Sequence, residues 1–548
     1  MTEKPGGDSV QTTRTKNSIG LRPIISPYEA PLLNGRNRPK AVNGRGCQNG
    51  TPLGADVKKV LLVQYLSISS RPLIVLKSMS KEEKREKVIR SEGENETEKI
   101  LSQICDNTFL KLWVYPNPYR KETKELCDVL VVFENHVFIF SVKSITFSSD
   151  KEIEVSWKRW KRKAVDDSIK QIEGAENWIN SHPDHVFLDR QCKKKLPINI
   201  NLEGCKFHRI VVAHGSEEAC KNSSIDNVAG SLAITYVDDF PNYEGRNLEL
   251  PFMLNLPREK VFHVFDSFNL DIILGELDTI SDLVGYFEAK EEAIQKYQML
   301  IYCGEEDLLA HYLYNFDQKR KKHYIGTQRK DINFINISEG EWYDFVKTED
   351  YRRKKEADQI SYFWDELIQK TLQNALDNVL LGDSDIYNEQ SALREMAKEP
   401  RFMRREISRA IHRSIEKMSD FGEKMGRHLS SYSSFYPDKR YVFLQLKPVP
   451  DKDYDTEYRP LRQEMLKIAC GVEKLKRPNS KKIIGIAIDA PKYAGTKSSE
   501  DFALLDCENL SDQNIKYYTE ANKAFQFFET DAVQMKYKRA YNFPQPKK

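Results

Sequence analysis

Two apolar runs that are separated by only two residues most constrain what this chain can fold into. LCDVLVVF (126–133) and HVFIFSVKSITF (136–147) are rich in β-branched and aromatic residues, and only Glu134 and Asn135 lie between them. This spacing is typical of a β-hairpin. The sequence therefore predicts two antiparallel strands in the first half of the chain.

The predicted hairpin contains ionic residues within otherwise apolar strands. A two-residue turn pairs Asp128 with Ser141 and puts Lys143 on the same face. A three-residue turn would instead place Asp128 opposite Val142, because a slip of one residue reverses the face. The shorter turn thus predicts that Asp128, Ser141 and Lys143 converge.

A predicted helix lies on each side of the hairpin in the sequence. In the first, over about 94–110, Glu94 and Glu98 share a face with apolar residues, so a carboxylate can sit at its inner edge. The second, over 157–179, has an apolar stripe in which Gln171 is the unusual polar member. Gly174 beside it permits close approach of another element.

Metal-dependent cleavage of phosphodiester bonds requires these residue types. Mg²⁺ prefers hard oxygen ligands, one or two of them carboxylates, and a cation is needed near the scissile phosphate. Burying an ionic group within an apolar strand costs free energy, so such a group is usually paired with an opposite charge or serves a function. Asp128 and Lys143 therefore indicate either a nuclease-type site or a structural ion pair.

The order of these residues resembles the PD-(D/E)XK (restriction-endonuclease-like) nuclease superfamily, and the glutamine-bearing helix is similar to its RecB-like branch. The resemblance covers about residues 90–215. It implies an α/β fold with a mixed sheet flanked by helices, Mg²⁺ or Mn²⁺ as cofactor, and nucleic acid as partner, with DNA favoured over RNA. The implied roles are metal ligand for Asp128, catalytic cation for Lys143, supporting acid and metal ligand for Glu98 or Glu94, and orienting group for Gln171.

The chain departs from the superfamily pattern at Ser141, where an acidic residue is usual. A hydroxyl is a poorer Mg²⁺ ligand than a carboxylate, so two functions remain open. One is an endo- or exonuclease, a hydrolase that would suit restriction, repair or anti-phage defence by analogy of fold. The other is a catalytically inactive nuclease-like module that binds nucleic acid or protein in a larger assembly. The run from FLKLWVYPNPY to KQIEGAENWI also resembles a family of uncharacterised bacterial proteins.

A basic segment at the start of the second predicted helix is a candidate nucleic-acid contact. WKRWKRK places cations beside Trp157 and Trp160, and phosphate attraction plus base stacking would suit nucleic acid. The alternative is that the tryptophans belong to the core and the cations to its solvated face. The candidate contact residues are Lys158, Arg159, Lys161, Arg162 and Lys163.

Composition shifts divide the chain into three parts. Residues 1–78 are interpreted as a flexible extension or as an upstream segment that is not translated. Residues 79–294 form the nuclease-like domain, and 295–548 are expected to form a separate α+β C-terminal domain that chooses a target or protein partner. The net charge of +3 means that nucleic-acid contacts must come from local patches.

The sequence lacks the signatures of several other classes of protein. The nine cysteines are scattered singly, without a CxxC pair, which favours reduced thiols over a zinc ribbon or disulfide framework. No apolar run or leader predicts a membrane segment or secretion, so a cytoplasmic location is expected. His208 and His214 face one side of a predicted strand and are interpreted as core or edge histidines rather than metal ligands.

Overall fold

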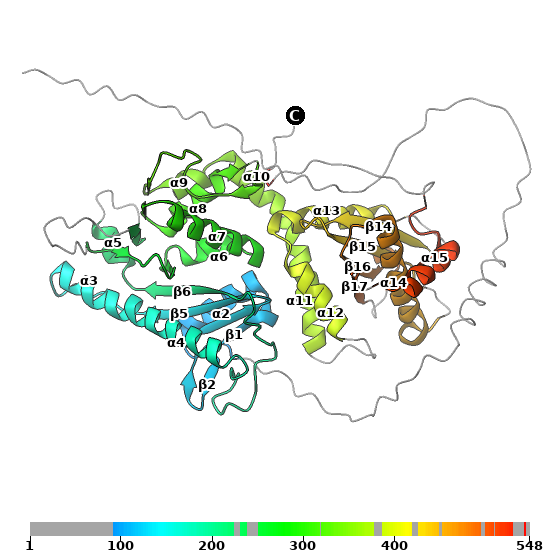
Figure 1. The fold of residues 1–548 in the computed structure, drawn as a ribbon, viewed down its shortest axis with the longest axis horizontal. Helices are drawn as coiled ribbons and strands as arrows, with labels where there is room; N and C mark the ends of the chain where they lie inside the picture. The colour runs from blue at the N-terminus through cyan, green and yellow to red at the C-terminus, as the bar shows by residue number, and fades with distance from the viewer. Residues whose placement is uncertain are drawn as a thin grey trace, which may run out of the picture.

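The computed structural model describes most of the chain from residue 91 onward. The described ranges are 91–223, 231–237, 250–317, 319–376, 386–418, 426–448, 452–494, 499–508, 510–529 and 542–543. The expected N-terminal extension, 1–78, lies outside them. The fold is a mixed α/β structure in which several sheets are flanked by helices (Figure 1).

The first sheet contains the predicted hairpin. Its strand order is β1-β4-β5-β6-β9, with the first two pairings antiparallel and the last two parallel. The bounds are β1 (Val114–Pro116), β4 (Val129–Phe133), β5 (His136–Ser144), β6 (Lys206–His214) and β9 (His263–Phe265). Every residue of β4 is buried, which accounts for its continuous apolar sequence.

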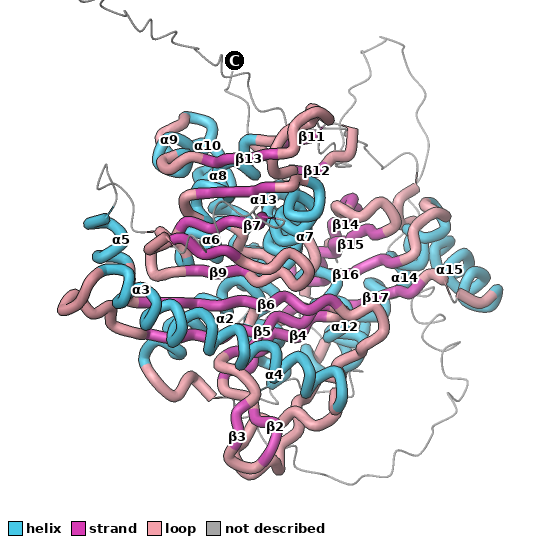
Figure 2. The backbone as a smooth tube through the Cα atoms, turned by 60° about the vertical axis from the view of Figure 1, so that its left-hand side comes forward, coloured by secondary structure: helices cyan, strands magenta, loops and turns pink. Residues whose placement is uncertain are grey.

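Helices cover both faces of this sheet. On one face, Phe109 of α2 (Glu96–Phe109) packs against Phe138 of β5, with ring centroids 4.8 Å apart. The other face carries α3 (Ile153–Lys161), a π-helical turn (Arg162–Asp166) and α4 (Asp167–Ser181), which follow one another directly and cross β5 and β6 (Figure 2). The sheet is therefore the middle of three layers.

A second sheet joins the two halves of the chain. Its order is β13-β10-β7-β8, and β10 pairs with β7 in antiparallel register. The strands are β7 (Ala233–Val237), β8 (Met253–Asn255), β10 (Met299–Tyr302) and β13 (Phe334–Ile337). Residues 294 and 295, between which the sequence predicted a boundary, lie within α7 (Ile280–Lys296), and the sheet pairs strands from before and after this helix.

The third sheet, in the C-terminal part, contains four strands in the order β14-β15-β16-β17. Their bounds are β14 (Arg427–Ser433), β15 (Lys439–Leu446), β16 (Lys482–Asp489) and β17 (Glu500–Asp506). One face packs on α14 (Arg459–Lys476), which in turn contacts α15 (Asp512–Phe525). Residues of the other face belong to an apolar cluster that also includes residues of the first two sheets.

Further strands and α-helices belong to the described fold. They are β2 (Tyr119–Lys121), β3 (Lys124–Glu125), α5 (Glu217–Ser223), α6 (Leu270–Glu276), α7 (Ile280–Lys296), α8 (Glu305–Tyr314), β11 (Phe316–Asp317), β12 (Lys322–His323), α9 (Glu341–Val346), α10 (Glu349–Asp358), α11 (Tyr362–Leu376), α12 (Ile386–Ala397) and α13 (Arg401–Glu416). Among the described residues, no helix combines the length and apolar character that a membrane crossing requires. All eight cysteines in the described part of the chain are free thiols.

Candidate functional site

The hairpin has the register that the two-residue turn predicted. Phe133 pairs with His136, and the ladder continues to Val129 opposite Phe140. Glu134 in the turn adopts a left-handed backbone conformation, with φ of 54°. Asp128, the next residue back, therefore lies opposite Ser141.

The Asp128 carboxylate is buried and approached by groups from the neighbouring strand. Its Oδ2 accepts a hydrogen bond from the Val142 backbone N–H at 2.5 Å, and the Lys143 ammonium lies 3.8 Å from the same oxygen. The Asp128 side chain is only 4% exposed, whereas that of Lys143 is 33% exposed. Lys143 thus reaches from solvent to a buried acid.

Gln171 on α4 completes this arrangement. Its amide nitrogen donates to Asp128 Oδ1 at 3.0 Å, and its amide oxygen accepts from the Ser141 hydroxyl at 2.9 Å. Two strands and one helix therefore bring together the four residues that the sequence singled out. We call Asp128, Ser141, Lys143 and Gln171 the hairpin site.

Glu98 lies beside the hairpin site, in the first turn of α2. The Asn95 side chain accepts from the Glu98 backbone N–H at 3.0 Å and donates to the Glu98 carboxylate at 2.5 Å, a reciprocal cap. The Asn117 amide also donates to this carboxylate at 2.9 Å, and the Asn117 backbone N–H donates to the Asp128 carbonyl at 2.8 Å. Glu98 is therefore anchored next to Asp128, while its carboxylate is already held by several donors.

Glu94 and Glu125 extend the acidic character of this region. The Tyr119 hydroxyl donates to Glu94 at 2.8 Å, and Glu94 shares a hydrogen bond with Glu125 of β3. Burial, that hydrogen bond and the charges of Glu94, Asp128 and Glu98 raise the pKa of Glu125 to about 7. The raised pKa reflects the cost of ionising Glu125 in a buried position beside other carboxyl groups.

Glu125 was not predicted from the sequence. Its strand is two residues long, and the β2–β3 hairpin that carries it is inserted between β1 and β4. The available signal was an acid three positions before Asp128 in KELCDVL. That signal is weak because three residues apart along an extended strand means opposite faces.

Burial also raises the pKa of Asp128, and the charge of Glu98 adds to the effect. Lys143, the Val142 N–H and Gln171 act in the opposite direction, since each interacts favourably with the ionised carboxylate. Several carboxyl groups therefore lie close together here, with the Lys143 ammonium beside Asp128. A divalent cation would relieve their repulsion, and carboxylate oxygens are the ligands that such a cation prefers.

A second cation approaches the site from the β2–β3 hairpin. Arg120 reaches α4 at Gly174, where a guanidinium nitrogen lies 3.9 Å from the position that a Cβ would occupy. Gly174 is one helical turn from Gln171. This distance is an ordinary van der Waals separation, so the structure shows no close approach that requires a glycine at position 174.

The predicted basic segment forms an exposed stripe on α3 and the π-helical turn. Lys158, Arg159, Arg162 and Lys163 are exposed, and Lys161 is half-buried in an ion pair with Asp166 at 3.1 Å. The neighbouring tryptophans are in the core, with Trp157 1% and Trp160 2% exposed. The expectation that bases stack on these two rings is therefore wrong, because both side chains are buried beneath the helix.

Comparisons with known proteins assign neither a family nor a function to the chain. No family model matches the chain, and no curated protein or solved structure is significantly similar to it.

Proposed function

We propose that this protein is a divalent-metal-dependent nuclease of the PD-(D/E)XK type. The observation that carries the proposal is the convergence of the Asp128 carboxylate, the Lys143 ammonium and the Gln171 amide at one end of a hairpin. These groups come from separate elements and meet next to further carboxylates. A simple ion pair would need neither the glutamine nor the additional acids.

The order of elements supports the same proposal. The helix α2 precedes three antiparallel strands, β1, β4 and β5, and the α3–α4 helix then leads to β6, which runs parallel to β5. The superfamily resemblance implies a helix, two strands and a second helix in this order, within a mixed sheet. Asp128 immediately precedes the middle strand of the three, and Lys143 lies near the end of the next.

Glu125 is proposed to supply the charge that Ser141 lacks. A metal ion held by Asp128 and Glu125, with the Val142 carbonyl as a neutral ligand, would have two carboxylates, as Mg²⁺ sites in proteins commonly do. When bound, such an ion activates water and stabilises charge that develops on the phosphate. The Ser141 hydroxyl instead holds Gln171, whose amide nitrogen orients Asp128.

The cations divide into two roles in this proposal. Lys143 lies beside Asp128 and its side chain is partly exposed, so its ammonium can interact with the scissile phosphate or the attacking water. Arg162 and Lys163, on the exposed stripe, would follow the phosphate backbone away from the site. The substrate is accordingly nucleic acid, with DNA as the first candidate.

The test is cleavage of single- and double-stranded DNA and RNA with Mg²⁺ or Mn²⁺. We expect metal-dependent cleavage that is lost in Asp128→Asn and in Lys143→Ala. Matched controls are Asp150→Asn and Lys170→Ala, because both residues are exposed and outside the hairpin site. Equal activity in Asp128→Asn and wild type would refute the proposal.

One observation favours a second function, a nuclease-like module that binds without cutting. Ser141 replaces the usual acid, and its hydroxyl is engaged by Gln171. The same experiment separates the two functions. Folded wild-type protein that binds nucleic acid through the basic stripe but cleaves no substrate with either metal would assign the binding module.

A further inference from the structure

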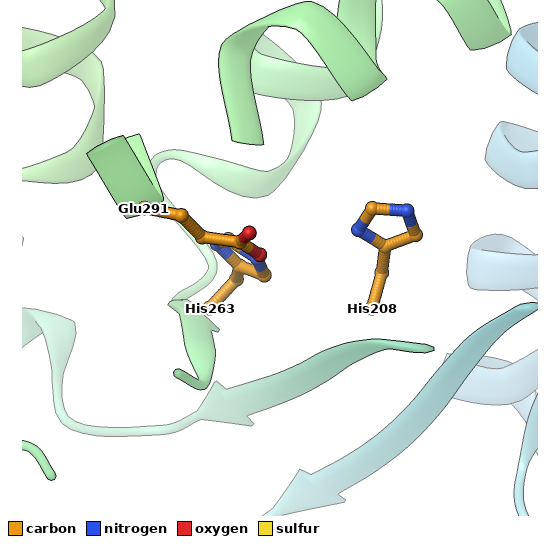
Figure 3. Close-up of side chains that lie close together, drawn as sticks. All are labelled: His208, His263 and Glu291. Atoms are coloured by element: carbon orange, nitrogen blue, oxygen red, sulfur yellow. The ribbon is translucent and has the colours of Figure 1, made fainter. Parts of the chain in front are cut away.

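A second cluster of metal-binding side chains lies on the face of the first sheet opposite the hairpin site. His208 is on β6, His263 opens β9, and Glu291 is on α7, which packs over this face. His263 pairs with Ile210, two residues after His208, so both imidazoles point to the same side. Figure 3 shows the Glu291 carboxylate beside the His263 ring, with His208 facing both.

The three side chains are close enough to share one ion. Their candidate ligand atoms all lie within 4.8 Å of one another, and His263 Nε2 is 3.9 Å from a Glu291 oxygen. Ligands about 2.0–2.1 Å from a tetrahedral zinc are roughly 3.3 Å apart. Glu291 is the most exposed of the three side chains, at 42%, and can rotate toward the two buried imidazoles when an ion binds.

The two histidines are buried with unused ring nitrogens. His208 is 2% exposed and His263 is 1% exposed. Among the described residues, neither nitrogen of His263 has a hydrogen-bond partner, and neither does Nδ1 of His208. A buried polar atom without a partner costs about 1–3 kcal/mol, so this arrangement is unfavourable unless something binds there.

The other nitrogen of His208 is held in place. Its Nε2 lies 2.9 Å from Nδ1 of His136, at the start of β5. Ligating imidazoles commonly use their second nitrogen in this way, which orients the ring and selects the tautomer. Nδ1 of His208 is therefore the atom presented to His263 and Glu291.

Burial lowers the pKa of His208 to about 3 and that of His263 well below its usual value, so both rings are neutral and have free lone pairs. Three cations stand nearby, but each is paired with a carboxylate. The pairs are Lys290–Glu305 at 2.8 Å, Lys206–Glu288 at 2.6 Å and Arg209–Glu176 at 2.6 Å.

We propose that His208, His263 and Glu291 bind a zinc ion. Two imidazoles and one carboxylate suit zinc, whereas Mg²⁺ prefers oxygen ligands alone. The partly exposed Glu291 side chain connects the proposed site with solvent, and a water molecule completes the coordination. The ion ties α7 to β6 and β9, and it is independent of the carboxylates around Asp128.

The first measurement is zinc binding to the full-length protein, by calorimetry and by metal analysis after desalting. We expect one zinc equivalent that Glu291→Gln binds at least 10-fold more weakly. Glu288→Gln, one turn away on α7, and Asp128→Asn, at the hairpin site, should bind zinc as wild type does. His136→Phe should weaken binding about 10-fold, since it removes the partner that orients His208.

The second measurement is the visible spectrum with Co²⁺ as probe. Tetrahedral coordination with nitrogen ligands gives intense bands that a six-oxygen site lacks, and these should disappear in Glu291→Gln. Circular dichroism establishes that each variant is folded. Zinc binding that is absent in wild type, unchanged in Glu291→Gln, or lost only in Asp128→Asn would overturn the proposal.

Discussion

Glu125 gives the sharpest prediction, because its protonation competes directly with metal binding. A carboxyl group must be ionised to bind a metal ion. With a pKa of about 7, only about 3% of Glu125 is ionised at pH 5.5, against about 90% at pH 8. The affinity for Mg²⁺ or Mn²⁺ should therefore rise about 30-fold over this interval through Glu125 alone.

Glu125→Gln removes this titrating group. We expect Glu125→Gln to bind Mn²⁺ more weakly at pH 8. Between pH 5.5 and pH 7, its mean slope of log affinity against pH should be smaller than that of wild type by about 0.8. Titration calorimetry or Mn²⁺ paramagnetic resonance measures both without depending on nuclease activity. Glu122→Gln is the matched control, an exposed glutamate of the same small hairpin.

Stability provides an independent readout of the same group. The pKa of Glu125 is higher in the folded protein than its ordinary value of 4.5, so the folded state binds more protons between these values. This contribution to stability is present below about pH 4.5 and is lost as the pH rises through 7. The Tm of the metal-free protein should fall over this range, and less so in Glu125→Gln.

Two results would refute this reasoning about Glu125. One is metal affinity in wild type that is independent of pH between 5.5 and 8. The other is the same pH dependence in wild type and in Glu125→Gln, which would assign the titrating proton to another group.

Three further predictions concern the hairpin site, a buried ion pair and the basic stripe. Gln171→Ala leaves Asp128 without a buried hydrogen-bond donor and should cost about 1–3 kcal/mol in urea unfolding; an unchanged midpoint would contradict this. Glu305→Gln leaves the fully buried Lys290 without its charge partner and should cost about 3–5 kcal/mol, measured by thermal unfolding. Arg162→Gln should weaken nucleic-acid binding and reduce its salt dependence by about one charge, and equal salt slopes would exclude a phosphate contact.

The sequence by itself determined the local part of the candidate site. The two-residue separation of the apolar runs set the hairpin register, because the turn and the two-residue period of a strand are short-range properties. The stripe on the second helix identified Gln171, because helical periodicity puts it on the packed face. The prediction that four side chains lie close together is therefore confirmed for Asp128, Ser141, Lys143 and Gln171. Their chemical roles remain predictions.

Only the tertiary structure decided the features that depend on distant segments. The pairing of β7 with β10 carries a sheet across the expected domain boundary, and strand pairing over such a distance leaves no signal in local periodicity. Glu125 reaches the acidic region through a short inserted hairpin. His208 was interpreted as a core or edge histidine and His263 was not singled out; the two became a candidate metal site only when β6 and β9 were placed side by side under α7.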